Sequence, residues 1–243
     1  MESNPYETPR TEELVRVDDR RARTGGTGDF DVGVCLSEGW EATKRNLGVL
    51  AAACVLFPVL SLVCYFTVLG FFFVLPVLWW GAVRLCVQAH DDRAELGTLF
   101  SGFSNYGDAL ARMFGVGFLS FVVGLPGSVV MFYGAFRDEL PVYRIGVLIS
   151  FVWSMVVGIR FHFAWLFAVD DDRPAVQAMG MSWVVTGRVW LKLVLLLFVV
   201  FAVNCLAMLT LGLGFLVTVP LTAMMFVSAY RQMVGRPQPV EPA

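Results

Sequence analysis

The sequence is poor in charge, in histidine and in paired cysteine, and each shortage excludes a class of protein. Asp, Glu, Lys and Arg make up 16% of its 243 residues, against roughly 25% in a typical soluble domain. It contains no basic block of the kind that binds nucleic acid. The 2 histidines and 5 cysteines include no C-x-x-C pair, so we predict no metal site, no disulfide and no cofactor.

Signals of membrane enzymes are also missing. The chain contains neither H-E-x-x-H nor G-x-S-x-G, the motifs of zinc proteases and serine hydrolases. No Asp or Glu falls inside an apolar run, and such carboxylates usually mark the path of proton- or sodium-driven transport. We therefore expect a protein that is not an enzyme.

What the sequence does contain is apolar residues in two long runs. Residues 47–83 and 193–230 are uncharged over 37 and 38 residues. Drawn as a single helix, either run would be about 55 Å long, almost twice the ~30 Å hydrocarbon core of a bilayer. Each run is therefore predicted to be a hairpin of two spanning helices. A further pair of apolar segments, 113–136 and 145–169, lies between them.

The two long runs resemble each other. Gly70 is followed by Pro76, and Gly214 is followed by Pro220, at one offset of 144 residues. Because glycine favours turns, we predict that each run turns near these glycines.

The predicted fold is all-α: a polytopic membrane protein with six transmembrane helices as three helical hairpins, each preceded by a short amphipathic interfacial helix. The expected domains are a disordered cytoplasmic tail at 1–31, a six-helix membrane domain at 32–232 with units of about 32–90, 91–170 and 171–232, and a short Pro-rich tail at 233–243.

An internal repeat supports these units. Asp91-Asp92-Arg93 and Asp171-Asp172-Arg173 each precede an amphipathic pattern, and Phe103 and Trp183 fall at the same offset of 80 residues. Aspartate suits a helix N-terminus, so each triplet is interpreted as the start of an interfacial helix. The segment ending at Trp40 matches more loosely. Chance similarity between sequences of restricted alphabet is the alternative.

The distribution of Lys and Arg predicts the orientation. With the N-terminus in the cytoplasm, only Arg137 and Arg144 fall on the outer side. The inner side receives Lys44, Arg45, Arg84, Arg93, Arg112, Arg173, Arg188, Lys192, Arg231 and Arg236. Positive residues favour the cytoplasmic side, so we predict a multi-pass protein of the cytoplasmic (inner) membrane with both termini in the cytoplasm.

Aromatic and basic residues of the interfacial helices are candidate contacts with inner-leaflet lipid or a partner protein. Aromatic side chains favour the headgroup depth and basic ones meet anionic lipid. The candidates are Trp40, Lys44, Arg45, Phe103, Arg112, Trp183 and Arg188. The alternative is that these helices only cover the inner ends of the bundle.

Arg160 and His162 are the candidate polar site within the membrane. Arg160 lies ten residues before Asp170, so about 15 Å along a helix. Intramembrane arginine is costly and marks a site by default. A structural or snorkelling role for Arg160, and core packing for His162, are the competing interpretations.

Short motifs before and after the predicted spans resemble a broad group of prokaryotic integral-membrane families of unknown function. The group includes the membrane domain sometimes fused to glycerophosphoryl diester phosphodiesterases. The motifs are Gly39-Trp40 with Lys44 and Asn46, Leu99-Phe100 with Gly102-Phe103, Arg160 with Ala164, Ala178 with Ser182, Thr186-Gly187-Arg188, and Ala229-Tyr230-Arg231. The resemblance implies a polytopic α-helical domain and carries over no catalytic residue, because in those fusions the phosphodiesterase is a separate domain.

Three functions remain as hypotheses. The first is a non-catalytic, membrane-embedded module that binds lipid or protein. Its partners would be membrane lipids, a membrane protein or a second copy of the chain. The second is a transporter or channel for a small or lipidic solute with Arg160 in the pathway. The third, a lipid-modifying enzyme, needs a polar cluster that the sequence does not show.

Overall fold

The computed structural model describes residues 28–137, 140–210 and 212–235, and the described chain is helical with no strand. Most of the predicted N-terminal tail and the end of the Pro-rich tail lie outside these residues. The last part of the predicted N-terminal tail belongs to the fold, since Phe30 is only 3% exposed.

The elements follow one another as short and long helices. They are α2 (Val32–Arg45), α3 (Leu47–Tyr65), the π-helix η1 (Gly70–Val74), α4 (Leu75–His90), the 3-10 helix η2 (Leu96–Phe103), α5 (Tyr106–Phe136), α6 (Leu140–Phe161), α7 (Ala164–Asp170), α8 (Ala175–Arg188), α9 (Trp190–Met208) and α10 (Phe215–Val234).

Five helical segments are long and apolar enough to cross a membrane, which makes this a membrane protein. They are Leu47–Tyr65, Gly70–His90, Tyr106–Phe136, Leu140–Asp170 and Trp190–Met208. The sixth predicted span corresponds to α10, which is not in this set. Its last turns carry Arg231 and Gln232, and Arg231 is buried against neighbouring helices.

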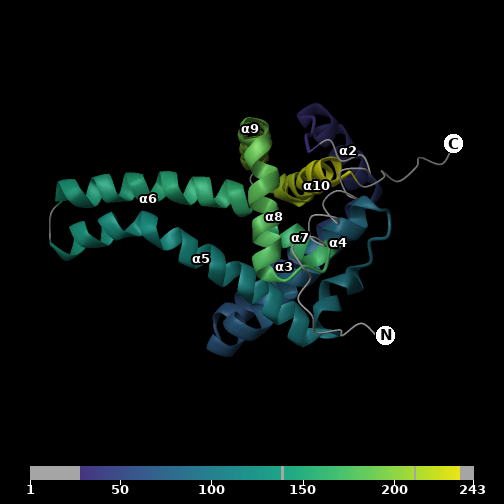
Figure 1. Cartoon of the computed structure of the whole chain (residues 1–243). Helices are drawn as coiled ribbons and strands as arrows, with labels where there is room; N and C mark the ends of the chain where they lie inside the picture. The colour runs from purple at the N-terminus through teal and green to yellow at the C-terminus, as the bar shows by residue number, and fades with distance from the viewer. Residues whose placement is uncertain (1–27, 138–139, 211, 236–243) are drawn as a thin grey trace, which may run out of the picture.

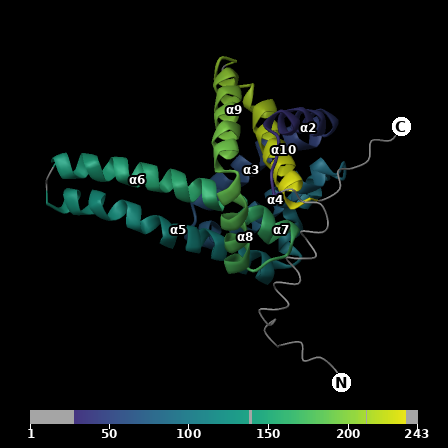
Figure 2. The same ribbon diagram turned by 45° about the horizontal axis from the view of Figure 1, so that its top comes forward.

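Three pairs of helices pack side by side: α2 on α10, η2 on α4, and α8 on α7. Figures 1 and 2 show α2 beside α10 and α8 beside α7. In each pair, a helix predicted to be interfacial lies against the end of another unit. The pairs join the third unit to the first, the first to the second, and the second to the third. The units therefore form a closed ring, which we call the central ring.

One position of the repeat makes a close contact in each of α2, η2 and α8, and for α8 that contact is with α6. A Cβ on Gly39 would lie 3.0 Å from the backbone nitrogen of Met225, and a Cβ on Gly102 would lie 2.6 Å from a carbonyl oxygen of α4. In α8 the same position is Ser182, whose hydroxyl donates a 2.7 Å hydrogen bond to the carbonyl of Arg160. Close backbone approach is thus part of the repeat.

Burial follows the same repeat through the core. Helices α3, α5 and α9 bury residues at two equivalent positions. Leu50, Met113 and Leu193 occupy the first position, and Ala53, Val116 and Leu196 occupy the second. Near the ring's centre, the equivalent residues Phe167 and Tyr230 pack edge to face with ring centroids 5.1 Å apart. The threefold repeat predicted from sequence is therefore a repeat of packing as well.

The two Asp-Asp-Arg triplets follow the ends of helices instead of beginning new ones. Asp92 and Asp172 follow the last residues of α4 and α7, and both have left-handed backbones, with φ of 55° and 54°. Gly235, at the equivalent place after α10, also has a positive φ of 72°. A left-handed residue is a common helix terminator, and aspartate tolerates it better than most side chains. The interpretation of these triplets as helix starts was wrong.

The second interfacial helix differs from its prediction as an amphipathic α-helix over about 91–103. It is a 3-10 helix that begins only at Leu96. Its residues Leu99 and Gly102 are pressed against the backbone of α4, and the narrower 3-10 coil places both on one line.

The pair formed by α5 and α6 extends away from the central ring and runs in a different direction from α9 in both views (Figures 1 and 2). The close contact between α5 and α6 depends on glycine. A Cβ on Gly134 would lie 2.4 Å from the Tyr143 nitrogen, and one on Gly146 would lie 2.3 Å from the Met131 nitrogen. Small residues allow this close packing between apolar helices.

Candidate functional site: an apolar cavity between the first two units

A cavity of about 1070 Å³ lies between the helices of the first unit and α5 of the second. None of the sixteen described residues that line it is charged, and nine are aromatic. They are Phe57, Pro58, Ser61, Leu62 and Tyr65 of α3; Phe71, Phe72, Leu75, Pro76 and Trp79 of η1 and α4; Met113, Phe114, Gly117, Phe118 and Phe121 of α5; and Trp165 of α7.

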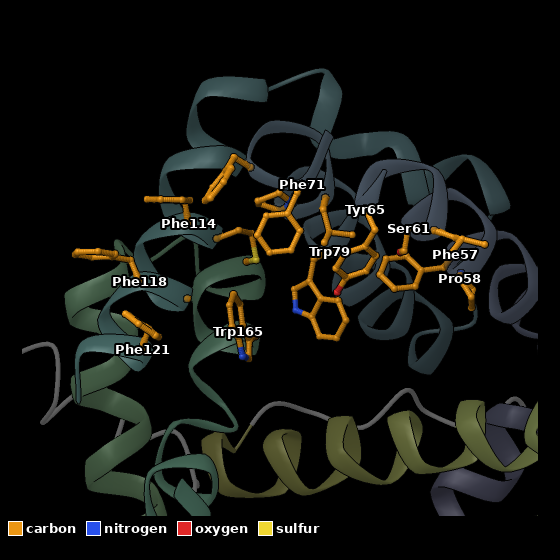
Figure 3. A pocket seen from close by; sticks show the side chains of 16 residues that line it. Phe57, Pro58, Ser61, Tyr65, Phe71, Trp79, Phe114, Phe118, Phe121 and Trp165 are labelled. Atoms are coloured by element: carbon orange, nitrogen blue, oxygen red, sulfur yellow. The ribbon is translucent and has the colours of Figure 1, made fainter. Parts of the chain in front are cut away.

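The aromatic side chains form two facing walls (Figure 3). Phe114, Phe118 and Phe121 follow one side of α5, at the three- and four-residue spacing that puts side chains on one helix face. Across the cavity, the Trp79 ring lies 5.6 Å from Phe57 and 6.2 Å from Trp165, measured between centroids. These are normal distances for tilted and edge-to-face aromatic pairs.

The polar side-chain atoms at the cavity are the hydroxyl of Ser61, the phenol oxygen of Tyr65 and the indole nitrogens of Trp79 and Trp165. Figure 3 shows the phenol oxygen of Tyr65 and the indole nitrogen of Trp79 in the space between the walls, with Trp165 standing in the same space. Within the described part of the chain, none of these three side chains makes a hydrogen bond. Trp153 provides a contrast, because its indole N–H donates to the Val123 carbonyl at 2.9 Å.

A second, much smaller cavity occupies the equivalent place between the second and third units. Its volume is about 130 Å³. The offset of 80 residues relates Trp79 and Gly117 of the large cavity to Ile159 and Leu197 of the small one. A leucine side chain therefore fills the place that Gly117 leaves open. The difference in volume between the two cavities follows in part from this exchange.

Arg160, predicted as an intramembrane site, lies outside the large cavity at the contact of α6 with α8. Its guanidinium stacks on Trp183 at 4.8 Å from the ring centroid and donates to the Trp183 carbonyl at 3.4 Å. Its own carbonyl accepts from Ser182. These contacts place the arginine against α8 and tie two units together.

His162 lies at the break between α6 and α7. Its ring packs on Phe226 of α10 at a centroid distance of 4.0 Å, and it lines the small cavity. His162 is only two residues from Arg160 in the sequence, but the two side chains pack against different helices.

The candidate inner-leaflet residues comprise three aromatic and four basic side chains. Trp40, Phe103 and Trp183 are exposed to a similar extent, 43%, 41% and 47%, although each sits on a different helix of the central ring. Lys44 lies 5.7 Å from the Trp40 ring centroid. The guanidinium of Arg188, at the end of α8, lies near the backbone of residue 28.

Arg45 and Arg112 form ion pairs within the chain. Arg45 binds Asp92 at 2.9 Å and Arg112 binds Asp172 at 2.7 Å. The first pair joins the last residue of α2 to the left-handed aspartate after α4, and the second joins α5 to the left-handed aspartate after α7. These two arginines hold the ring's geometry in addition to any contact with lipid.

The third unit has a related ion pair. Lys192 binds Asp29 at 2.6 Å, and this hydrogen bond lowers the pKa of the Asp29 carboxyl. On the same side of the ring, Cys35 is buried between α2 and α10, and loss of solvation raises the pKa of its thiol to about 11. The thiol therefore stays protonated at neutral pH.

Sequence reasoning missed the aromatic cavity because its lining residues come from separate helical segments whose packing the sequence does not show. The repeat carried a usable signal, since Gly117 stands where Leu197 stands one unit later.

No family model, curated protein or solved structure matches the chain.

Proposed function

We propose that the chain is a non-catalytic lipid-binding module of the cytoplasmic membrane, with six crossings and both termini in the cytoplasm. The observation that carries the proposal is the uncharged, aromatic-lined cavity between the first two units. Its volume of about 1070 Å³ is just above the ~300–1,000 Å³ range of ligand pockets. Lipid is the apolar ligand that surrounds a protein with membrane-spanning helices.

The oblique direction of α5 and α6 is compatible with crossing the bilayer. Helix α5 has 31 residues, which makes it about 46 Å long. That is half again the ~30 Å of hydrocarbon, so a strongly tilted α5 still reaches both surfaces. The ion pairs and aromatic residues of the central ring then lie at the inner surface, as the distribution of Lys and Arg favours.

The transporter hypothesis has less support. It requires Arg160 in a solvated pathway, whereas the Arg160 guanidinium is stacked on Trp183 between α6 and α8. The resemblance to uncharacterised prokaryotic membrane families is part of the proposal and fits a module without catalytic residues.

Gly117→Leu should empty the cavity of lipid. A Cβ at Gly117 would meet Trp165 at 3.5 Å, an ordinary contact, so the backbone accepts the change while the side chain enters the cavity. We expect at least a tenfold loss of the lipid that remains bound to the purified protein. The measurement is native mass spectrometry of protein released from lipid nanodiscs.

Gly124→Leu is the matched control. It lies on the same helix, and a Cβ there meets nothing within 4 Å, so bound lipid should stay at the wild-type level. Equal lipid retention by both variants would show that the cavity does not hold lipid.

Replacing Trp40 or Phe103 by alanine should weaken the association of phospholipid with the central ring. Both side chains are exposed, and neither makes a hydrogen bond to another described residue. The fold should therefore persist in the variants. We expect fewer phospholipids to be retained in native mass spectrometry, with an unchanged unfolding temperature. Val55→Ala, an exposed change in the middle of α3, is the control. Unchanged phospholipid counts in both ring variants would exclude the inner-leaflet contact.

A further inference from the structure

The large cavity offers hydrogen-bond donors but no charge. Tyr65, Trp79 and Trp165 are the lining aromatics with an O–H or N–H group, and Ser61 adds a buried hydroxyl. Among the described residues, none of these groups donates a hydrogen bond to another side chain or to the backbone. A plain acyl chain would leave these donors unpaired in an apolar space, which is costly. A phosphate or ammonium group would meet no opposite charge there. The chemistry therefore selects an uncharged ligand that carries acceptor oxygens.

The walls favour a flat ligand. Phe114 and Phe118 are nearly parallel, with an interplanar angle of 8° and centroids 6.2 Å apart, so the α5 wall presents parallel rings. Trp79 and Trp165 present their indoles across the cavity (Figure 3). Aromatic side chains interact with a planar ring through offset stacking and edge contacts beyond simple burial.

The length of the cavity also fits a ring followed by a chain. The α5 wall runs over nine residues from Met113 to Phe121, about 12 Å along the helix. This is longer than a single substituted ring, so the first part of an attached chain lies between the same walls.

We propose that the cavity binds a quinone lipid, with its carbonyl-bearing ring beside Trp79 and Trp165 and its isoprenoid tail leading into the bilayer. This inference rests on the proposed lipid-binding function and names the class of lipid. It concerns binding alone: the indole N–H groups donate to the carbonyl oxygens and the phenylalanines of α5 contact the ring. A quinone satisfies the donors, the absence of charge at the lining residues and the planar walls together.

The test measures retention of a short-chain prenylated quinone by the purified full-length protein after gel filtration, read by the absorbance of the quinone. A prenyl alcohol of equal tail length is measured in parallel by mass spectrometry. We expect saturable quinone binding and at least tenfold weaker binding of the alcohol. Gly117→Leu should abolish quinone retention and Gly124→Leu should not.

Trp79→Phe and Trp165→Phe, singly and together, remove the donors but keep the aromatic walls. The double variant should bind quinone at least tenfold more weakly, which corresponds to about 1.4 kcal/mol, while its binding of the alcohol stays unchanged. The single variants should show intermediate losses, and their unfolding temperatures report whether the fold persists.

Two results would overturn the inference. Equal retention of quinone and alcohol, or a double Phe variant that binds quinone like the wild type, would show that the ring is not recognised. If lipid retention still responds to Gly117→Leu in that case, the lipid-binding function stands and only the choice of quinone fails. If neither ligand binds and Gly117→Leu leaves the retained lipid unchanged, both proposals fail.

Discussion

Gly81→Ala should be the most damaging replacement by alanine among the glycines that the structure describes. A Cβ at Gly81 would lie 1.8 Å from the carbonyl oxygen of Leu99, so α4 and η2 must separate. Overpacking usually costs about 1–3 kcal/mol because side chains shift. Here the obstacle is backbone, and we expect a loss of about 3 kcal/mol in the free energy of unfolding. That loss should lower the unfolding temperature by about 10 °C.

Gly97→Ala provides the control for this prediction. It lies on η2 itself, and a Cβ there meets nothing within 4 Å, so its unfolding temperature should be close to that of the wild type. Thermal unfolding in detergent, followed by tryptophan fluorescence, measures both variants. Equal temperatures for the two would show that η2 does not pack against α4 as described.

Arg231→Met should have the second largest effect, because it breaks an ion pair at the junction of the first and third units. The Arg231 guanidinium donates to Asp91 at 2.7 Å, and its side chain is only 10% exposed. Removing one partner of a buried pair costs about 3–5 kcal/mol, since the other charge is left uncompensated. Asp91 remains 34% exposed, so we expect the lower end of that range.

Two further variants separate the pair from other effects. Lys44→Met breaks the exposed i,i+3 pair with Glu41, which is worth about 0–1 kcal/mol, and should leave stability nearly unchanged. Arg231→Met combined with Asp91→Asn removes both charges and should regain part of the loss. An Arg231→Met protein as stable as Lys44→Met would contradict the pairing.

Local features of the fold followed from the sequence. The long runs turn where glycine and threonine permit it: the Thr67 and Thr210 hydroxyls accept hydrogen bonds from the backbone N–H groups of Gly70 and Gly214. These contacts span three or four residues, so sequence spacing suffices to predict them. The internal repeat was visible for the same reason, because each unit repeats its own local signals.

Contacts between distant segments did not follow. Periodicity places an apolar face on α2 but does not say that this face packs on α10, which is nearly two hundred residues away. Arg160 was singled out for its charge, and only the structure shows that its guanidinium stacks on Trp183. The cavity depends on one small residue, Gly117, where Leu197 stands in the next unit, and hydropathy alone does not weight that difference.

The contact between α2 and α10 sets an order for the protein's synthesis. The backbone N–H of Asp31 donates to Gln232 across 201 residues, and Ser228 donates to Glu38 across 190. A ribosome makes α2 first and α10 last, so α2 waits for its partner through almost the whole of translation. The seam of α5 with α6 can form as soon as those two neighbouring helices are inserted. The packing of α10 on α2, which brings the two ends of the fold together, is therefore the last event of assembly.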